Sequence, residues 1–268
     1  MTGRCEWGTV ESMARTLVWF SCGAASAVAA SEALKRWPDA EVLYCDTLKY
    51  EHPDNVRFLS DVEKWLKTPI KLLRSDKYAD IFDVFNKTGY LVGVGGARCT
   101  TELKKKVRKQ YQRPDDIHVF GFTADEEDRI DKYEDENPDD RVAWVLRDLG
   151  IRKADCYRII QQAGIELPAM YKLGYNNNNC IGCVKGGMGY WNKIRIDFPD
   201  AFQRMAEQER KMNVAICKTY EGKKRLRVFL DELDPKAGRD VPMPDIECGV
   251  VCVRPKEPNE VLSVFNEV

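Results

Sequence analysis

Four cysteines of this chain have the surroundings of metal or redox ligands. Cys180 and Cys183 form a Cys-x-x-Cys pair in a stretch rich in Gly and Asn, and Cys99 follows a second glycine-rich stretch. This spacing lets two thiolates reach one metal ion or cluster. A redox dithiol or two buried cysteines are the alternatives. We expect Cys99, Cys180 and Cys183 to meet at one site, with one cysteine of the tail, Cys248 or Cys252, as a fourth ligand.

A serine- and glycine-containing turn is the second pattern that points to chemistry. The apolar run Leu17–Phe20 stops at Ser21-Cys22-Gly23-Ala24-Ala25-Ser26 and continues as an alanine-rich stretch. A helix that begins there presents unpaired N–H groups and partial positive charge, which suit a phosphate. No Gly-Lys-Ser/Thr follows, so the turn is not a Walker A motif. We expect the phosphate contacts, unless this is an ordinary turn, to be Ser21, Cys22, Gly23, Ala24 and Ser26.

Polar residues also follow two other apolar runs. Asp46 and Thr47 come after Glu41–Cys45, and the segment 121–129 comes after a run that begins at Ile117. In open α/β sheets, ligands bind beyond the carboxyl ends of the strands. The further nucleotide contacts that we expect are Asp46, Thr47, Gly121, Thr123, Asp125 and Arg129.

Short apolar runs alternate with helical patterns through residue 150. The expected strands are Leu17–Phe20, Glu41–Cys45, Ile70–Leu73, Ile117–Gly121 and Val142–Leu146. The expected helices between them are Ala25–Arg36, Asn55–Leu66, Ala79–Phe85 and Glu102–Tyr111. This alternation predicts an α/β fold with a mostly parallel five-stranded, Rossmann-like sheet and helices on both faces.

The chain changes character after Gly150. We therefore expect a nucleotide-binding α/β domain over residues 1–150 and a helical, irregular, cysteine-bearing extension over 151–268. The extension is expected to contain helices near Lys153–Ala163 and Asp200–Lys211 and a tail with little regular structure. The acidic stretch Asp125–Asp140 is expected to be a solvated loop. The basic run Lys104–Lys109 is expected to be a solvated face, with phosphate contacts as the alternative.

Composition limits the classes of function. The 268 residues carry a net charge of −1, so no global field attracts nucleic acid or a membrane. No apolar run reaches the roughly 18 residues of a membrane span. Ten cysteines and an N-terminal segment without a secretory apolar region predict reduced thiols and a cytoplasmic location. With only two histidines, a metal site should be sulfur-rich, and His118, in an apolar run, is expected in the core.

Six segments in chain order resemble the phosphoadenosine phosphosulfate reductase family of the PP-loop superfamily. They are Ser21–Ser26, Tyr44–Thr47 with Glu51–Pro53, Arg98–Thr100, Gly121–Arg129, Gly174–Cys183 and Glu247–Gly249. The chain departs from the family at the phosphate loop, which lacks Lys-Asp, and at Cys99, which stands alone where cluster-binding reductases have Cys-Cys. Thr123 also replaces an Arg, and Val250 and Val251 follow Glu-Cys-Gly.

The resemblance implies a sulfonucleotide reductase-like oxidoreductase. Its adenine nucleotide, phosphoadenosine phosphosulfate or adenosine phosphosulfate, would give its sulfur to the thiolate of Cys248 as a thiosulfonate. A thioredoxin-like reductant would then release sulfite. A [4Fe–4S] cluster, or alternatively Zn²⁺, would occupy the cysteine site.

Two other functions stay open at this point. One is an adenylating sulfurtransferase that uses ATP, with Mg²⁺, to thiolate tRNA or DNA. The other is a nucleotide-binding module without catalysis that holds a structural zinc. We also leave open whether the chain forms a homodimer.

Overall fold

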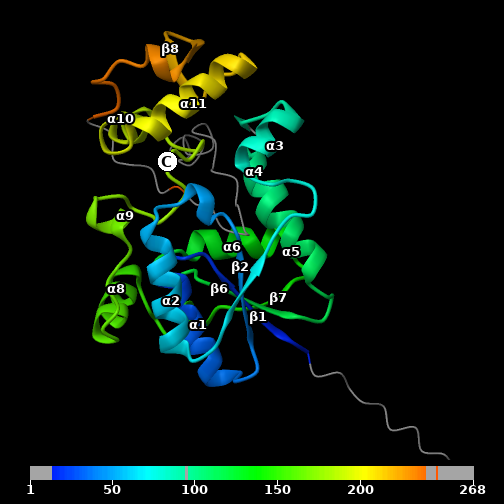
Figure 1. The fold of residues 1–268 in the computed structure, drawn as a ribbon. Coiled ribbons are helices and arrows are strands. Elements are labelled where there is room, and N and C mark those ends of the chain that lie inside the picture. Colours follow the sequence, from blue (N-terminus) through cyan, green and yellow to red (C-terminus); the bar gives the residue numbers. More distant parts are fainter. Residues whose placement is uncertain (1–13, 94–95, 240–245, 247–268) are drawn as a thin grey trace, which may run out of the picture.

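A central sheet of five parallel strands organises the molecule (Figure 1). The structure, a computed structural model, describes residues 14–93, 96–239 and 246. In the spatial order β3-β2-β1-β6-β7, the strands are Ile70–Leu73, Glu41–Cys45, Thr16–Phe20, Ile117–Phe120 and Arg141–Ala143. The predicted five-stranded parallel α/β sheet is therefore confirmed. Chain order reverses on the two sides of β1, and ligands of such sheets bind at this switch point.

Strand β1 is buried on both of its faces, as its continuous apolar sequence requires. Val18 and Phe20 pack in one apolar cluster, while Leu17 and Trp19 pack in another on the opposite face. The first cluster is covered by α1 (Ala24–Arg36), α2 (Asp54–Leu66), α7 (Val145–Asp148) and α8 (Lys153–Gln162). The second is covered by α5 (Lys106–Tyr111) and α6 (Glu127–Glu136). Helices therefore lie on both faces of the sheet.

A third apolar cluster lies beyond the carboxyl edge of the sheet and joins distant segments. From the first half of the chain it takes α3 (Ile81–Thr88), α4 (Arg98–Thr100) and the π-helical turn Thr101–Lys105. From the second half it takes α9 (Ala169–Lys172), α10 (Met188–Asp197) and α11 (Pro199–Met212). The remaining elements are the 3-10 turns Leu48–Tyr50 and Leu230–Glu232 and two antiparallel pairs, β4 (Val92–Gly93) with β5 (Gly96–Ala97) and β8 (Cys217–Glu221) with β9 (Lys224–Val228).

Three local predictions were wrong. The strand expected over Val142–Leu146 ends at Ala143, and Val145 and Leu146 belong to α7. The acidic stretch expected as a loop contains α6, because Ile130 and Tyr133 lie one helical turn apart and bury the same face. The tail, expected to have little regular structure, contains the β8–β9 hairpin, and α10, with Gly189 in its first turn, was not predicted.

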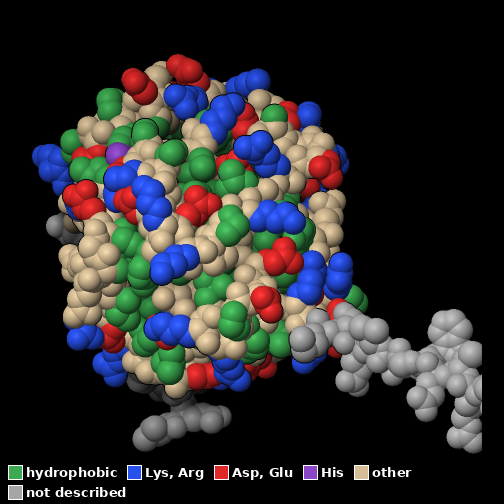
Figure 2. All heavy atoms as spheres, turned by 60° about the horizontal axis from the view of Figure 1, so that its bottom comes forward, with side chains coloured by type: hydrophobic (Ala, Val, Ile, Leu, Met, Phe, Trp, Pro, Cys, Tyr) green, Lys and Arg blue, Asp and Glu red, His purple; other side chains and the backbone are tan. Residues whose placement is uncertain are grey.

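The domain boundary predicted at residue 150 lies just before α8, a helix that packs against the central sheet. Cys156 and Ile160 of α8 belong to the same apolar cluster as Ala29 and Ala33 of α1. None of the helices in the described part of the chain is long and apolar enough to cross a membrane. Figure 2 shows one face on which Lys and Arg side chains alternate with Asp and Glu, as the net charge of −1 would give.

Candidate functional site

A cavity of about 240 Å³ lies at the carboxyl ends of β1, β2 and β6. Seven of the predicted nucleotide contacts line it, namely Ser21, Gly23, Ser26, Gly121, Thr123, Asp125 and Arg129. The other four, Cys22, Ala24, Asp46 and Thr47, are not among its described lining residues. The cavity therefore collects residues from three strand ends that are up to 108 positions apart, between Ser21 and Arg129.

The serine-glycine turn is held together by the Ser26 hydroxyl. Ser26 Oγ accepts hydrogen bonds from the amides of Ser21 (3.0 Å) and Gly23 (3.4 Å) and donates to the Gly23 carbonyl (3.0 Å). The Tyr171 hydroxyl lies across the turn, 3.1 Å from the position that a Cβ atom at Gly23 would occupy. The amides of Ala25 and Ser26, in the first turn of α1, have no intrahelical acceptor and can bind an anion.

Gly121 at the end of β6 brings this helix end close to the sheet. A Cβ atom at Gly121 would lie 2.6 Å from the Ser26 amide nitrogen and 3.0 Å from the Ala25 carbonyl carbon. Real side chains do not tolerate such distances to backbone atoms, so only glycine fits. The absence of a side chain at Gly121 therefore keeps the first turn of α1 against the cavity.

Cys22 has a structural role in the turn. It is fully buried and has a φ of 59°, a left-handed conformation that few residues other than glycine adopt. Its carbonyl oxygen accepts a hydrogen bond of 2.6 Å from the side-chain amide of Asn178, which also donates to Asn55 Oδ1 at 2.8 Å. The thiol of Cys22 donates to the Asn55 carbonyl. These contacts hold a backbone conformation that is unfavourable by itself.

Asp46 and Thr47 make contacts within the protein. Asp46 Oδ2 pairs with Arg74 at 2.8 Å and its Oδ1 accepts from the Leu48 amide at 3.1 Å. The Thr47 hydroxyl donates to Glu51 at 2.6 Å. Glu51 in turn accepts from Asn55, the residue that Asn178 contacts. This buried network connects the end of β2 to the serine-glycine turn.

Three positively charged side chains line the cavity, Lys104, Arg129 and Lys153. Arg129 pairs with Glu126 and its guanidinium lies 3.8 Å from the centre of the Phe122 ring. Lys104 is only 7% exposed, and Arg108 of the same basic run is 4% exposed. For these two residues the expected solvated face was wrong. Lys104 lies in the π-helical turn, and such turns are frequent at functional sites.

Four of the thiols are shielded from water. Burial raises the pKa of Cys45, which lines the cavity, to about 11, although Lys104 and Arg108 oppose the shift. Burial also raises the pKa of Cys22 well above its usual value and that of Cys156 and Cys217 to about 12. A protonated thiol is a weak nucleophile, so these four are unsuited to attack a substrate near neutral pH.

The Cys180–Cys183 turn is organised by Tyr190. The Tyr190 hydroxyl accepts a hydrogen bond from the Cys183 amide (2.9 Å) and donates to the Cys180 carbonyl (3.3 Å). Gly182 supplies a positive φ of 73°. Cys99 packs against the apolar cluster that contains Cys183.

The predicted metal site is not assembled by these three cysteines alone. In the described ranges, no group of three or more His, Cys, Asp or Glu side chains is placed to hold a metal ion. Cys248, the predicted fourth ligand, lies outside the described residues. The donor set therefore does not fit a closed zinc or [4Fe–4S] site as it stands, and the metal centre stays a prediction.

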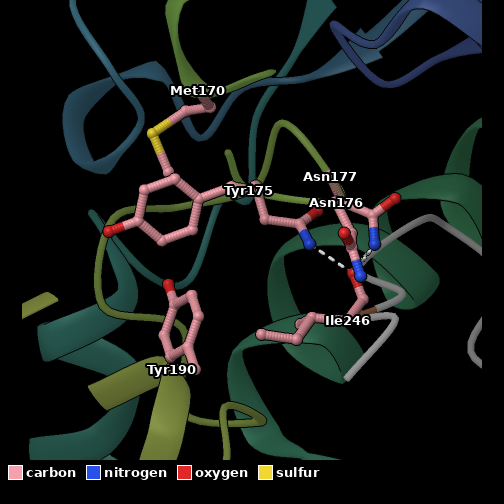
Figure 3. Close-up of a pocket in the computed structure, with 7 residues that line it drawn as sticks. Met170, Tyr175, Asn176, Asn177, Tyr190 and Ile246 are labelled. Carbon is pink, nitrogen blue, oxygen red and sulfur yellow. Dashed lines mark hydrogen bonds between the residues drawn. The ribbon is translucent and has the colours of Figure 1, made fainter. Parts of the chain in front are cut away.

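The tail returns to the cavity at Ile246. Figure 3 shows the side-chain amides of an asparagine run directed at the Ile246 carbonyl oxygen, which accepts from Asn177 at 3.3 Å and from Asn179. Ile246 is buried and lines both the cavity and a smaller adjoining pocket beside Tyr175 and Tyr190. The sequence interpretation missed this role of the asparagines, whose signal was their run of four directly before Cys180.

No protein-family model matches the chain, and no curated protein is similar to it in sequence at a significant level. The resemblance in six ordered segments therefore stays a prediction.

Proposed function

We propose that this chain is a sulfonucleotide reductase-like oxidoreductase that binds an adenosine phosphosulfate in the cavity. One observation carries the proposal, the position of Ile246 on the cavity wall. Cys248 follows two residues later, and two extended residues reach about 7 Å. The proposal requires that Cys248, which lies outside the described residues, reaches the cavity that Ser21, Gly23 and Ser26 line.

The lining supplies the groups that such a nucleotide needs. The amides of Ala25 and Ser26, with the charge of Lys104, would hold a phosphate or sulfate group. Tyr157 offers aromatic surface to the adenine ring. The side-chain oxygen of Asn178 is buried at the cavity and has no hydrogen-bond partner among the described residues, so it can accept from a ligand donor.

In the proposed reaction, the Cys248 thiolate attacks the sulfur atom of the phosphosulfate. The bond between that sulfur and the bridging oxygen breaks, and its electron pair leaves with the adenosine phosphate. The product on the protein is a thiosulfonate. A dithiol reductant of the thioredoxin class then attacks the Cys248 sulfur, releases sulfite, and is oxidised to its disulfide as the Cys248 thiol is restored. Burial leaves Cys45, the thiol among the described lining residues, protonated and unsuited to this role.

Binding and single-turnover measurements test the proposal. Calorimetry should detect binding of adenosine phosphosulfate or phosphoadenosine phosphosulfate to the protein. Mass spectrometry should find a sulfonate adduct on Cys248. Cys248→Ser should abolish the adduct and sulfite release but retain nucleotide binding, whereas Cys252→Ser should retain both. The proposal would be overturned if neither nucleotide bound to the protein. Cleavage of ATP to AMP and pyrophosphate would instead support the adenylating sulfurtransferase.

A further inference from the structure

A compact group of cations and one tyrosine occupies the outer face of the β8–β9 hairpin. In the antiparallel register, Lys218 lies opposite Arg227 and Tyr220 lies opposite Arg225. Because alternate residues of a strand point to the same face, these four side chains share one face. All four are exposed, and Tyr220 is 59% exposed. The other face carries buried Cys217 and the half-buried Thr219, Leu226 and Val228, so the hairpin has a defined inner and outer side.

The charge on this hairpin is not balanced within the protein. Residues 217–228 contain five Lys and Arg residues and a single Glu, whereas the whole chain has a net charge of −1. None of these five cations forms an ion pair with any residue that the structure describes. Elsewhere on the same unit, Arg210 pairs with both Asp231 and Glu232. Like charges directly opposite in a sheet, as at Lys218 and Arg227, are destabilising.

The hairpin is held firmly at its base. The buried carboxylate of Glu209 on α11 accepts the amide of Ile216 through one oxygen and the amide of Leu230 through the other. These two residues flank the hairpin on either side. Figure 1 shows β8 on the far side of α11 from the central sheet. The outer face is therefore presented on a fixed support and apart from the cavity.

We propose that this face binds single-stranded nucleic acid. Residues two apart on a strand lie about 7 Å apart and neighbouring strands about 5 Å apart, so Lys218, Arg225 and Arg227 occupy positions next to Tyr220 on this face. Proteins that bind single-stranded nucleic acid usually combine cations, which contact the phosphates, with aromatic rings, which stack on the bases. Double-stranded nucleic acid would not use the Tyr220 ring, because its bases are already stacked on one another. An acidic peptide would not use the ring either, because it has no base to stack on it. The inference is independent of what the cavity binds.

Fluorescence anisotropy with a labelled single-stranded oligonucleotide tests the proposal on the full chain. The triple variant Lys218→Gln, Arg225→Gln, Arg227→Gln should lose at least tenfold in affinity. It should also reduce the slope of log K against log[salt] by about 2, because each phosphate contact on a single strand contributes about 0.7. Tyr220→Ala should lose at least about fivefold with the salt slope unchanged, and Tyr220→Phe should bind as the wild type does.

A matched control removes the same charge elsewhere. The control is the triple variant Lys35→Gln, Lys64→Gln, Arg158→Gln, which changes three exposed cations on α1, α2 and α8. Its affinity for the oligonucleotide should stay within about twofold of the wild-type value. The proposal is overturned if this control loses as much as the hairpin variant or if the wild type binds no oligonucleotide. It is also overturned if duplex of the same sequence or polyglutamate binds equally well. Competition by excess adenosine phosphosulfate would place the oligonucleotide in the cavity and overturn the proposal in the same way.

Discussion

The side-chain amide of Asn178 donates a 2.6 Å hydrogen bond to the carbonyl oxygen of Cys22, 156 residues earlier in the chain. This bond links the asparagine run before Cys180 to the turn at which α1 begins. The same run binds the Ile246 carbonyl through Asn177 and Asn179. One short segment thus holds both the proposed phosphate turn and the start of the tail.

Asn178→Ala should weaken both the fold and the cavity. The substitution leaves the buried Cys22 carbonyl and Asn55 Oδ1 without their donor, which costs about 1–3 kcal/mol of unfolding free energy. Urea denaturation measures the loss, and calorimetry should show weaker nucleotide binding. Gln162→Ala, at an exposed position on α8, is the control and should change stability by less than about 0.5 kcal/mol. Equal effects of the two substitutions would contradict the prediction.

The left-handed backbone at Cys22 predicts that glycine is preferred over alanine there. Cys22→Gly should be more stable than Cys22→Ala by about 1 kcal/mol, because a Cβ atom is unfavourable at a φ of 59°. Both variants lose the same thiol, so their difference isolates the backbone. At Cys156 in α8 the order should reverse, since glycine in a helix is about 1 kcal/mol less favourable than alanine. Urea denaturation of the four variants measures their free energies of unfolding. The same stability order of Gly and Ala at both positions would refute the explanation.

Gly121→Ala should displace the first turn of α1. The new Cβ would lie 2.6 Å from the Ser26 amide nitrogen, so the helix end or β6 must move. We expect nucleotide affinity to fall by at least tenfold and the melting temperature to fall. Gly187→Ala is the matched control, because a Cβ at Gly187 meets no atom within 4 Å and its φ is −81°. Normal binding by Gly121→Ala would show that the cavity does not depend on this close contact.

His118 should make stability depend on pH in the acid range. The buried imidazole accepts the Trp19 indole N–H at its Nδ1 (3.1 Å), and burial lowers its pKa from 6.5 to about 4. Between these values the unfolded chain binds the proton more readily. This contribution, up to about 3 kcal/mol, is therefore complete above pH 6.5 and is lost as the pH falls toward 4.

The chain has only two histidines, so NMR can follow each imidazole. His118→Gln should flatten the dependence of unfolding free energy on pH between 6.5 and 4. A His118 resonance that titrates near 6.5 would contradict the prediction.

The sequence alone predicted the sheet and one part of the site. Continuous apolar runs such as Leu17–Phe20, alternating with helical patterns, require strands covered on both faces, and all five expected strands are present, although the last is shorter. The switch point of a parallel sheet then brings together Ser21, Gly121 and Arg129, which line one cavity as expected. This part could be predicted because the carboxyl ends of parallel strands always meet at one edge.

Other features depended on contacts that sequence spacing does not encode. The buried positions of Lys104 and Arg108 follow from a π-helical turn and from packing, since their run reads as a solvated basic face. Asp46 pairs with Arg74, which directly follows β3. The asparagine run reaches Cys22 and Ile246 only because α9 and α10 fold back over the edge of the sheet. Hydrogen bonds between residues 67 to 156 positions apart have no local signal, so tertiary structure alone decided them.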